Sequence, residues 1–486
     1  MTHMTQDSRF EIVIGLEIHT QLRTRSKIFC GCPNQFGAPP NTQICPVCAG
    51  FPGVLPVLNR EVLNMAIKTG LALKGQIRLY NEFSRKNYFY PDLPAGYQIS
   101  QFELPIVEHG ELMIEPEGAQ PKRIGITRIH MEVDAGKNLH EGIQGASWVD
   151  LNRTGTPLLE IVTEPDLRSG AETGAFLKKL RSIVRYLDVC DGTMEEGSFR
   201  CDTNLSVRRW GDPQLGKRVE IKNLNSIRNV MRAIEFESER QIELIDFGEP
   251  VIQETRLWDA NQNLTRPMRG KEEAHDYRYF PEPDLPPVRL NPERIAAIRL
   301  AMPELPDEKC LRFQNNLGLS AYDAGVLTAS REMADYFETA LTAFPDVDPK
   351  AVANWVTGEL LGRLNKEGLD ITQSPVQAPH LATLTRMVQN NVISGKIAKT
   401  VFARMFEQGG DPQQIVVEQG LTQVTDQGAI ATEVERVLAA HPDKITQYRA
   451  GKIQLLGFFV GEIMKATRGK ANPGVVNALL KSRLET

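Results

Sequence analysis

The chain has 486 residues, of which 24% are charged and 41% hydrophobic, and its formal net charge is -5. This length is enough for two or three domains, each with its own core, and the acidic balance excludes a protein that binds nucleic acid over its whole surface. No apolar run approaches the length of a membrane span, and residues 1–9 have the character of neither a signal peptide nor a transit peptide. We therefore expect a cytoplasmic protein with no membrane partner.

Polar residues at every second position mark the strands predicted in the first part of the chain. In residues 10–19, Glu17 and His19 alternate with apolar residues, so their side chains point to the same side of the strand. The same alternation recurs in later segments. It groups Arg128, His130, Glu132 and Asp134, then Asp150 and Asn152, then Arg200, Asp202 and Asn204, and finally Glu220 and Lys222.

These groups admit two interpretations. A solvated sheet face also alternates polar with apolar residues, but it normally mixes residue types without a theme. Carboxylates and imidazoles suit Mg²⁺, and arginine and lysine suit phosphate, so the repeated bias favours a metal and phosphate site on one face of a sheet. The glycine-loop, zincin and nucleophile-elbow motifs are absent from the sequence, which disfavours those enzyme classes.

Four of the seven cysteines are paired at short spacing in a segment rich in glycine, proline and asparagine. Cys30 and Cys32 precede Cys45 and Cys48, a pattern typical of structural zinc. The alternatives are four free thiols, or a decayed or facultative site, because the first pair is closer than the usual spacing. The three isolated cysteines are predicted to be small core residues and are Cys190, Cys201 and Cys310.

The alternating pattern ends near a cluster of prolines at 281–287, and helical signals follow it. Asn291 and Pro292 are typical of a helix start, as are Asp348 and Pro349. We predict an α+β domain over residues 1–290, a helical domain over 291–410 and a small helical tail domain over 411–486.

The tail is basic although the whole chain is acidic. Lys465, Arg468 and Lys470 follow a predicted core helix. Such a patch fits contact with a phosphate backbone, but it also fits an ordinary solvated helical face.

The segment VDLNRTGTPLLEI at 149–161 closely resembles the signature of the B subunits of bacterial aspartyl/glutamyl-tRNA(Asn/Gln) amidotransferases. Further blocks that resemble this family run essentially from end to end of the chain. They include residues 13–19, 85–92, 97–101, 194–202, 222–225, 277–284 and 457–465.

The resemblance implies a cradle-shaped α+β catalytic domain with a largely antiparallel sheet, followed by helical domains. It also implies ATP-dependent amidation of Glu-tRNA(Gln) or Asp-tRNA(Asn). In that family the B subunit forms an acyl phosphate on the charged tRNA, and ammonia from an amidase partner, the glutaminase subunit, displaces the phosphate. A small third subunit completes the heterotrimer.

The resemblance further assigns residues. It implies Mg²⁺ ligands at Glu17, His19, Glu132, Glu160 and Asp202, of which His19, Glu132 and Glu160 are the expected catalytic residues. Glu160 is the only one that alternation does not select. Candidate contacts to ATP phosphates are Lys86, Arg200 and Lys222, and candidate contacts to tRNA are Lys465, Arg468 and Lys470. Zinc at the cysteines would be structural and dispensable for the chemistry, because some members of the family lack these cysteines.

Two rival functions remain. A non-catalytic tRNA-binding scaffold would use only the basic tail, but intact carboxylates on the sheet argue against it. A free-standing carboxylate–amine ligase that acts on a small metabolite would use the same acyl-phosphate chemistry, but it would leave the helical extension and the basic tail without a role.

Overall fold

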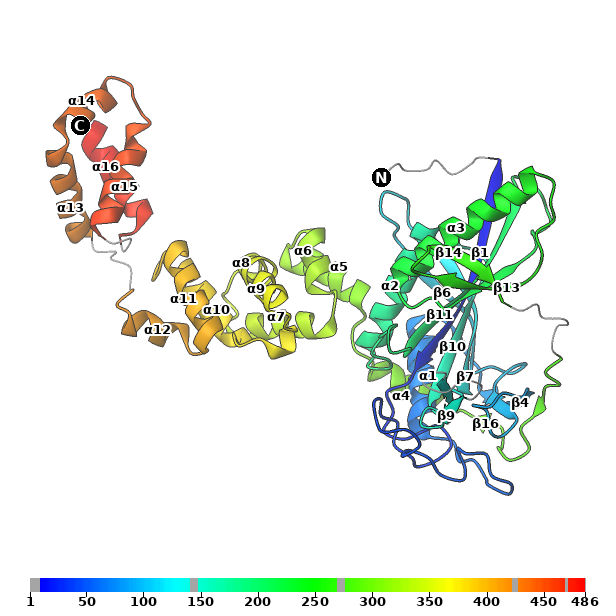
Figure 1. Cartoon of the computed structure of the whole chain (residues 1–486). Helices are drawn as coiled ribbons and strands as arrows, with labels where there is room; N and C mark the ends of the chain where they lie inside the picture. Colours follow the sequence, from blue (N-terminus) through cyan, green and yellow to red (C-terminus); the bar gives the residue numbers. More distant parts are fainter. Residues whose placement is uncertain (1–8, 140–146, 269–275, 422–426, 468–470, 486) are drawn as a thin grey trace. The chain divides into compact units, whose positions relative to one another are not determined.

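The computed structural model describes residues 9–139, 147–268, 276–421, 427–467 and 471–485. The chain divides into two compact units, Met1–Leu305 and Pro306–Thr486 (Figure 1). The first unit contains a large sheet with helices, and the second is helical in its described part. The predicted fold class, an α+β domain followed by helices, is confirmed.

The main sheet of the first unit has 12 strands in the described part of the chain, and β1 (Phe10–Gln21) runs near its middle. Its pairs are antiparallel except that of β12 (Val219–Lys222) with β13 (Thr255–Asp259). Off the main path, β6 (Val107–Ile114) pairs with β7 (Lys122–Val133), and β2 (Gln76–Ile77) pairs with β6. The main path runs β14 (Leu264–Pro267), β13 (Thr255–Asp259), β12 (Val219–Lys222), β11 (Phe199–Arg209), β1, β10 (Pro157–Thr163), β7 (Lys122–Val133), β5 (Tyr97–Ser100), β4 (Ser84–Asn87) and β15 (Phe280–Pro281).

Two small sheets accompany the main one. β3 (Tyr80–Asn81) pairs with β16 (Val288–Arg289), and β8 (Lys137–Leu139) pairs with β9 (Trp148–Asp150). The second pair matters for the site, because β9 leads into the segment that becomes β10.

Three helices cover the apolar face of the main sheet: α1 (Arg60–Ala72), α2 (Gly170–Tyr186) and α3 (Ile227–Asp246). Ser169 starts α2 by accepting a hydrogen bond from the Glu172 amide, and Phe176 lies on the buried stripe of that helix. α2 approaches α3 closely, since a Cβ atom on Gly174 would lie 2.6 Å from the Met231 sulfur. Ile14, Leu16 and Ile18 of β1 share one core with these helices.

The first unit continues past the predicted domain end at residue 290. Asn291 caps α4 (Pro292–Leu300) as its sequence indicates, but Ile295 and Ile298 of that helix pack against the core of the sheet unit. The compact unit therefore ends at Leu305.

The second unit contains two separate hydrophobic cores. One is built from residues between Phe313 and Val416, and the other from residues between Ile430 and Leu484. The helices of the first core are α5 (Pro306–Leu317), α6 (Ala321–Leu327), α7 (Arg331–Ala343), α8 (Pro349–Asn354), a π-helical turn (Trp355–Leu360), α9 (Leu361–Glu367), a 3₁₀ turn (Ile371–Gln373), α10 (Ala378–Gln389), α11 (Gly395–Gln408) and α12 (Pro412–Glu418). Those of the second are α13 (Gln427–Ala440), α14 (Pro442–Arg449), α15 (Leu455–Ala466) and α16 (Pro473–Glu485).

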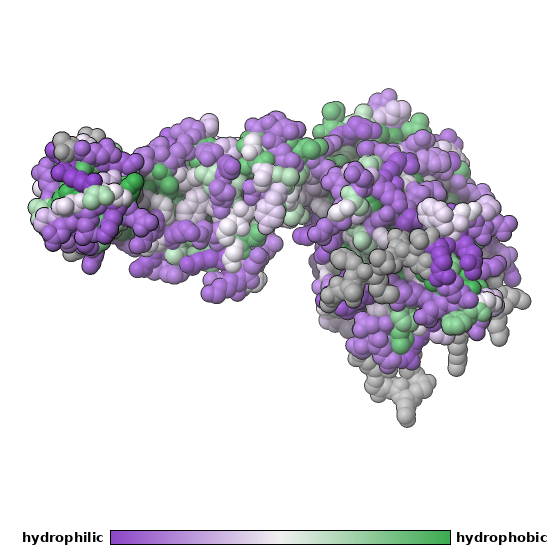
Figure 2. All heavy atoms as spheres, turned by 90° about the horizontal axis from the view of Figure 1, so that it is seen from above, coloured by the Kyte–Doolittle hydropathy of each residue, from purple (hydrophilic) through white to green (hydrophobic). Residues whose placement is uncertain are grey.

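Apolar side chains are thus gathered into three cores. The face drawn in Figure 2 is correspondingly mainly hydrophilic. Among the described residues, no helix combines the length and the apolar character that a membrane span requires.

We predict that Phe176→Ala lowers the free energy of unfolding of the first unit by about 3–5 kcal/mol, because it removes a fully buried ring from α2 and leaves a cavity. Denaturant unfolding measures the change. Lys178→Ala, on the exposed side of the same helix, is the matched control and should have little effect. Equal losses from both variants would contradict the packing of α2.

Candidate active site on the sheet

The pairing of β1 with its two neighbours brings the predicted polar residues onto one face. His19 lies opposite Glu160 of β10 on one side and opposite Arg200 of β11 on the other. Glu17 lies opposite Asp202. Residues directly opposite each other in an antiparallel pair point to the same face of the sheet, so the predicted shared face is confirmed for these strands.

Three side chains converge at the centre of this face. The His19 Nε2 atom is 3.5 Å from Glu132 Oε1 and 3.5 Å from Glu160 Oε2. One donor atom from each residue lies within 4.8 Å of the others, a spacing at which a single ion can bind all three. The Glu132 and Glu160 side chains are only 4% and 12% exposed. One imidazole and two carboxylates form a donor set that fits a divalent cation with room for further oxygen ligands.

Neighbouring groups hold the two carboxylates in place. His130 Nε2 lies 3.1 Å from Glu160 Oε2 and 3.7 Å from Glu132 Oε2, and Ser100 donates a hydrogen bond of 3.3 Å to Glu132. Burial lowers the pKa of His130, but the two carboxylates outweigh it and raise that pKa to about 9. Burial conversely raises the pKa of Glu160, yet His130 and His19 hold it well below its usual value. Both shifts favour an ionised Glu160 beside a protonated His130.

Glu17 and Asp202 lie outside this group of three, two residues further along the strands. Glu17 accepts a hydrogen bond of 3.0 Å from Asn204, and Asp202 accepts one of 2.7 Å from Lys222. Burial raises the pKa of Glu17, and the negative charge of Glu160 raises it further. The structure thus gathers three of the five expected Mg²⁺ ligands and leaves the other two beside them on the same face.

The three candidate phosphate-binding cations border the carboxylates but differ in their partners. Lys222 is held between Asp202 and Glu220, 3.0 Å from the latter. The Arg200 guanidinium donates a 2.9 Å hydrogen bond to Asp134. Lys86 has no carboxylate partner among the described residues.

Aromatic rings surround the Lys86 ammonium instead. It lies 4.8 Å from the centre of the Tyr277 ring and 5.8 Å from that of Tyr88. Lys86 is opposite Gln98 of β5, and Ser100 of the same strand is opposite Glu132, so register places Lys86 on the polar face.

Asp134 organises the end of the polar face nearest to Arg200. Besides that arginine, it accepts a hydrogen bond of 2.9 Å from Gln21, and it lies 3.6 Å from the Arg153 guanidinium. Burial raises the pKa of Asp134, but Arg200 and Arg153 outweigh burial and lower it. The carboxylate therefore fixes the position of Arg200.

Sequence reasoning missed several residues of the site. Gln98 and Ser100 alternate with Ile99, so periodicity could have selected them, but their strand is only four residues long. Gln21 extends the alternation of Glu17 and His19 by one step. No local signal could have selected Arg153 or Tyr277, which arrive from loops.

The prediction for Asp150 and Asn152 is wrong. Asp150 ends β9, in the separate two-stranded sheet, and Asn152 follows it in a turn. Asp150 accepts a hydrogen bond from the Asn41 amide, and Asn152 accepts one from the Gln43 amide. These side chains satisfy backbone groups of an irregular loop and do not contribute to the polar face.

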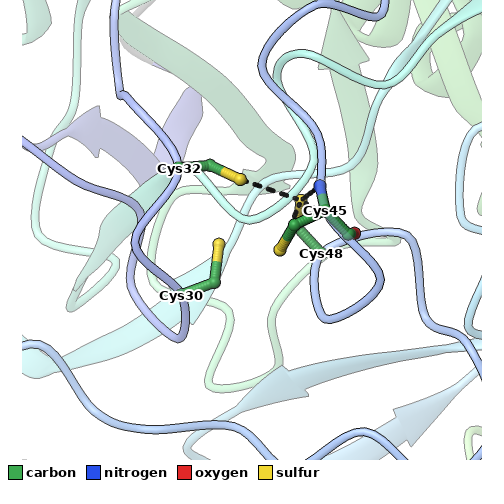
Figure 3. A group of neighbouring side chains, drawn as sticks. All are labelled: Cys30, Cys32, Cys45 and Cys48. Carbon is green, nitrogen blue, oxygen red and sulfur yellow. Dashed lines mark hydrogen bonds between the residues drawn. The ribbon is translucent and has the colours of Figure 1, made fainter.

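That loop carries the four paired cysteines, and we call residues 30–48 the knuckle loop. Figure 3 shows the four side chains directed toward one another from its two ends. Cys48 Sγ lies 3.8 Å from Cys45 Sγ and 4.0 Å from Cys32 Sγ. A tetrahedral zinc site with Zn–S bonds of about 2.3 Å requires sulfurs roughly 3.8 Å apart, so the geometry fits.

The surroundings favour a thiolate at Cys48, whereas a hydrogen bond with Cys48 raises the pKa of Cys30 and burial raises the pKa of Cys32. The fully buried Lys27 ammonium lies 2.7 Å from the Gln43 carbonyl oxygen and 3.6 Å from Cys48 Sγ. A hydrogen bond with Cys30 outweighs burial and, together with the Cys45 amide and the charge of Lys27, lowers the pKa of Cys48 to about 4. The isolated Cys190 and Cys201 are buried in the sheet core as predicted, and Cys310 packs against the first helical core.

The candidate tRNA-binding residues are only partly described. Lys465 lies in the last turn of α15 and is exposed. Arg468 and Lys470 lie outside the described residues.

Fold and site together define an enzyme domain in which one sheet face carries clustered carboxylates, histidines and cations. A family model described as the GatB/GatE catalytic domain matches residues 12–296, and one described as the GatB domain matches residues 335–484.

Curated relatives match the chain over nearly its whole length. The aspartyl/glutamyl-tRNA(Asn/Gln) amidotransferase B subunit of Alkalilimnicola ehrlichii is 58% identical over 98% of this chain and 100% of its own. Proteins of the same name from Thioalkalivibrio sulfidiphilus and Halorhodospira halophila are 56% and 57% identical, each over 98% of this chain and 100% and 99% of their own. The chain belongs to the family of aspartyl/glutamyl-tRNA(Asn/Gln) amidotransferase B subunits.

We predict that Asp134→Asn lowers the free energy of unfolding by about 3 kcal/mol, because it removes the charge that compensates the largely buried Arg200. Denaturant unfolding measures the loss. Asp188→Asn is the matched control, because it breaks an exposed pair with Arg23 and should cost less than about 1 kcal/mol. A change at Asp134 as small as that at Asp188 would contradict the role given to this carboxylate.

Proposed function

We propose that this chain uses ATP to activate the side-chain carboxylate of glutamate attached to tRNA(Gln), or of aspartate attached to tRNA(Asn), and then amidates it. The observation that carries the proposal is the His19, Glu132 and Glu160 group on a cation-bordered sheet face, in a chain of this family. Ammonia is supplied by the glutaminase subunit, and a small third subunit completes the heterotrimer.

The reaction has two steps. An oxygen of the substrate carboxylate attacks the γ-phosphorus of ATP, and the bond between this phosphorus and the bridging oxygen breaks, so that ADP leaves and an acyl phosphate forms. The ammonia nitrogen then attacks the acyl carbon, the carbon–oxygen bond to phosphate breaks, and the amide forms with loss of a proton. Both steps concentrate negative charge, which the site must neutralise.

The residues of the polar face suit this need. His19, Glu132 and Glu160 would hold Mg²⁺, with Glu17 and Asp202 as further ligands when nucleotide is bound, and the ion supplies charge neutralisation at the phosphates. Arg200 and Lys222, each held by a carboxylate, are positioned for phosphate oxygens. Among the described residues Lys86 contacts aromatic rings and no carboxylate, so its charge is available for the transferred phosphoryl group.

The remaining parts have separate roles in the proposal. The sheet unit performs the chemistry, the helical region follows it in the chain, and the tail after residue 411 binds tRNA through Lys465, Arg468 and Lys470. The knuckle loop holds a structural zinc ion. The protein acts in the cytoplasm, where charged tRNA and ATP are available.

We predict that Glu132→Gln lowers the rate of Gln-tRNA formation at least about a hundredfold, because it removes a charge that binds the metal at the reacting phosphate. The assay follows ADP and Gln-tRNA produced from Glu-tRNA(Gln) by the complete heterotrimer. Glu117→Gln, at an exposed position outside the site, is the control. Unchanged activity in Glu132→Gln would favour a tRNA-binding scaffold, with the chemistry in a partner chain.

We predict about one zinc ion per chain, and its loss in Cys48→Ser, because the other three thiols cannot complete a tetrahedral site. Elemental analysis of the purified protein measures the metal. Cys310→Ser is the matched control, because Cys310 lies in the second unit, and it should keep the metal. Metal-free wild-type protein with four reactive thiols would contradict the zinc assignment.

A further inference from the structure

A cavity of about 380 Å³ lies at the end of β1, and none of the residues proposed to bind metal or ATP phosphates lines it. Its walls come from five parts of the first unit. These are residues 21–24 at the end of β1, residues 34–38 of the knuckle loop, Lys137 of β8, the turn at 150–156 and the loop at 191–198.

Two wall residues connect the cavity to the polar face. Gln21 lies two residues after His19 on β1, and both Gln21 and Arg153 contact Asp134, the carboxylate that holds Arg200. A ligand in the cavity would therefore lie next to the groups proposed to bind metal and phosphate.

The lining of the cavity combines an aromatic ring with charged groups of both signs: the cations are Arg23, Lys137 and Arg153, and the carboxylates are Asp150, Asp191 and Glu196. Phe36 projects from the knuckle loop with 66% of its surface exposed, and Lys137 lies 5.3 Å from the centre of its ring. Lys137 has no carboxylate partner among the residues that the structure describes. Arg153 is held by the carbonyl oxygens of Ala135 and Gly136. An exposed ring can stack on a base, and Lys137 and Arg153 can contact a phosphate.

The side-chain amides of two asparagines in the cavity wall provide further hydrogen-bonding groups. Asn34 and Asn152 line it beside the cations, and both side chains are also fixed to the backbone of neighbouring segments. The volume lies within the range of sites for small ligands, so it suits one nucleotide and not a duplex.

We propose that this cavity binds the 3′-terminal nucleotide of the charged tRNA, with its base on Phe36 and its phosphate toward Lys137 and Arg153. The amino acid esterified to that nucleotide then extends toward Glu132 and Glu160. The inference rests on the proposed function, because it concerns how the substrate of that reaction is held.

Another exposed ring offers a rival position for the base. Phe89 is 87% exposed on the loop after β4, but it does not line the cavity. Its neighbour Tyr88 is engaged with Gln98 and with Lys86. The comparison of Phe36 with Phe89 therefore decides which ring binds the base.

The test uses the complete heterotrimer and measures the KM for Glu-tRNA(Gln), the KM for ATP and the glutaminase rate. A second readout is the affinity for a short probe, adenosine 5′-monophosphate carrying glutamate through a 3′-amide. Phe36→Ala should raise the tRNA KM and the probe Kd by about 5- to 100-fold, since stacking on an aromatic side chain contributes that much. The KM for ATP and the glutaminase rate should change by less than about twofold.

Phe36→Trp should restore probe binding, which distinguishes stacking from a local folding defect, and zinc content verifies that the knuckle loop is intact. Phe51→Ala, a change at a nearby exposed ring outside the cavity, is the matched control. Lys137→Met should weaken probe binding and reduce its sensitivity to salt, because it removes a charge opposite the phosphate, whereas Lys178→Met should do neither.

Each outcome is decisive. Equal probe affinity in wild type and Phe36→Ala, or a loss in Phe89→Ala instead, overturns the inference. Wild-type complex that binds the probe through Phe36 but makes no Gln-tRNA contradicts the proposed function and leaves the nucleotide site standing. Normal Gln-tRNA formation with no effect of Phe36→Ala contradicts only the nucleotide site.

Discussion

The antiparallel pairing of β1 with β10 on one side and β11 on the other fixes the whole polar face. His19 is the meeting point, because Glu160 and Arg200 lie opposite it on the two neighbouring strands. A slip of one residue in either pair would turn the partner strand over and exchange its polar and apolar faces. The apolar residues of β1, packed against the helices, therefore hold the register on which the polar residues depend.

Burial of so many charges on one face requires compensation. Glu160 is paired with His130, and Asp134 is paired with Arg200. Such pairs add little to stability, because desolvation offsets much of their attraction. Their value is that cations and carboxylates are already fixed when a metal ion and phosphates arrive, so little reorganisation is left for the reaction itself.

Periodicity in the sequence predicted which residues share a face, since that property is local to each strand. It could not predict which of them meet, because the meeting of His19 with Glu160 depends on pairing between strands that are far apart in the chain. The same rule failed at Asp150 and Asn152, where a short strand of a different sheet shows the same alternation.

Cysteine spacing predicted the knuckle cluster correctly as a group, because that constraint is also local. The end of the first unit was less predictable, since a capped helix start at Asn291 does not reveal which core the helix joins.

The place of β1 in the sheet has a consequence for synthesis of the chain. β1 is the first of the described strands to be made, yet its partners begin at residues 157 and 199. One edge of β1 stays without its native partner until β10 has emerged from the ribosome, and the other until β11 has emerged. Unpaired edges of this kind invite aggregation, and pairing across such sequence distances is slow. Stable pairing of β1 on both edges therefore waits until at least residue 209, about two thirds of the way through the first unit, has been translated.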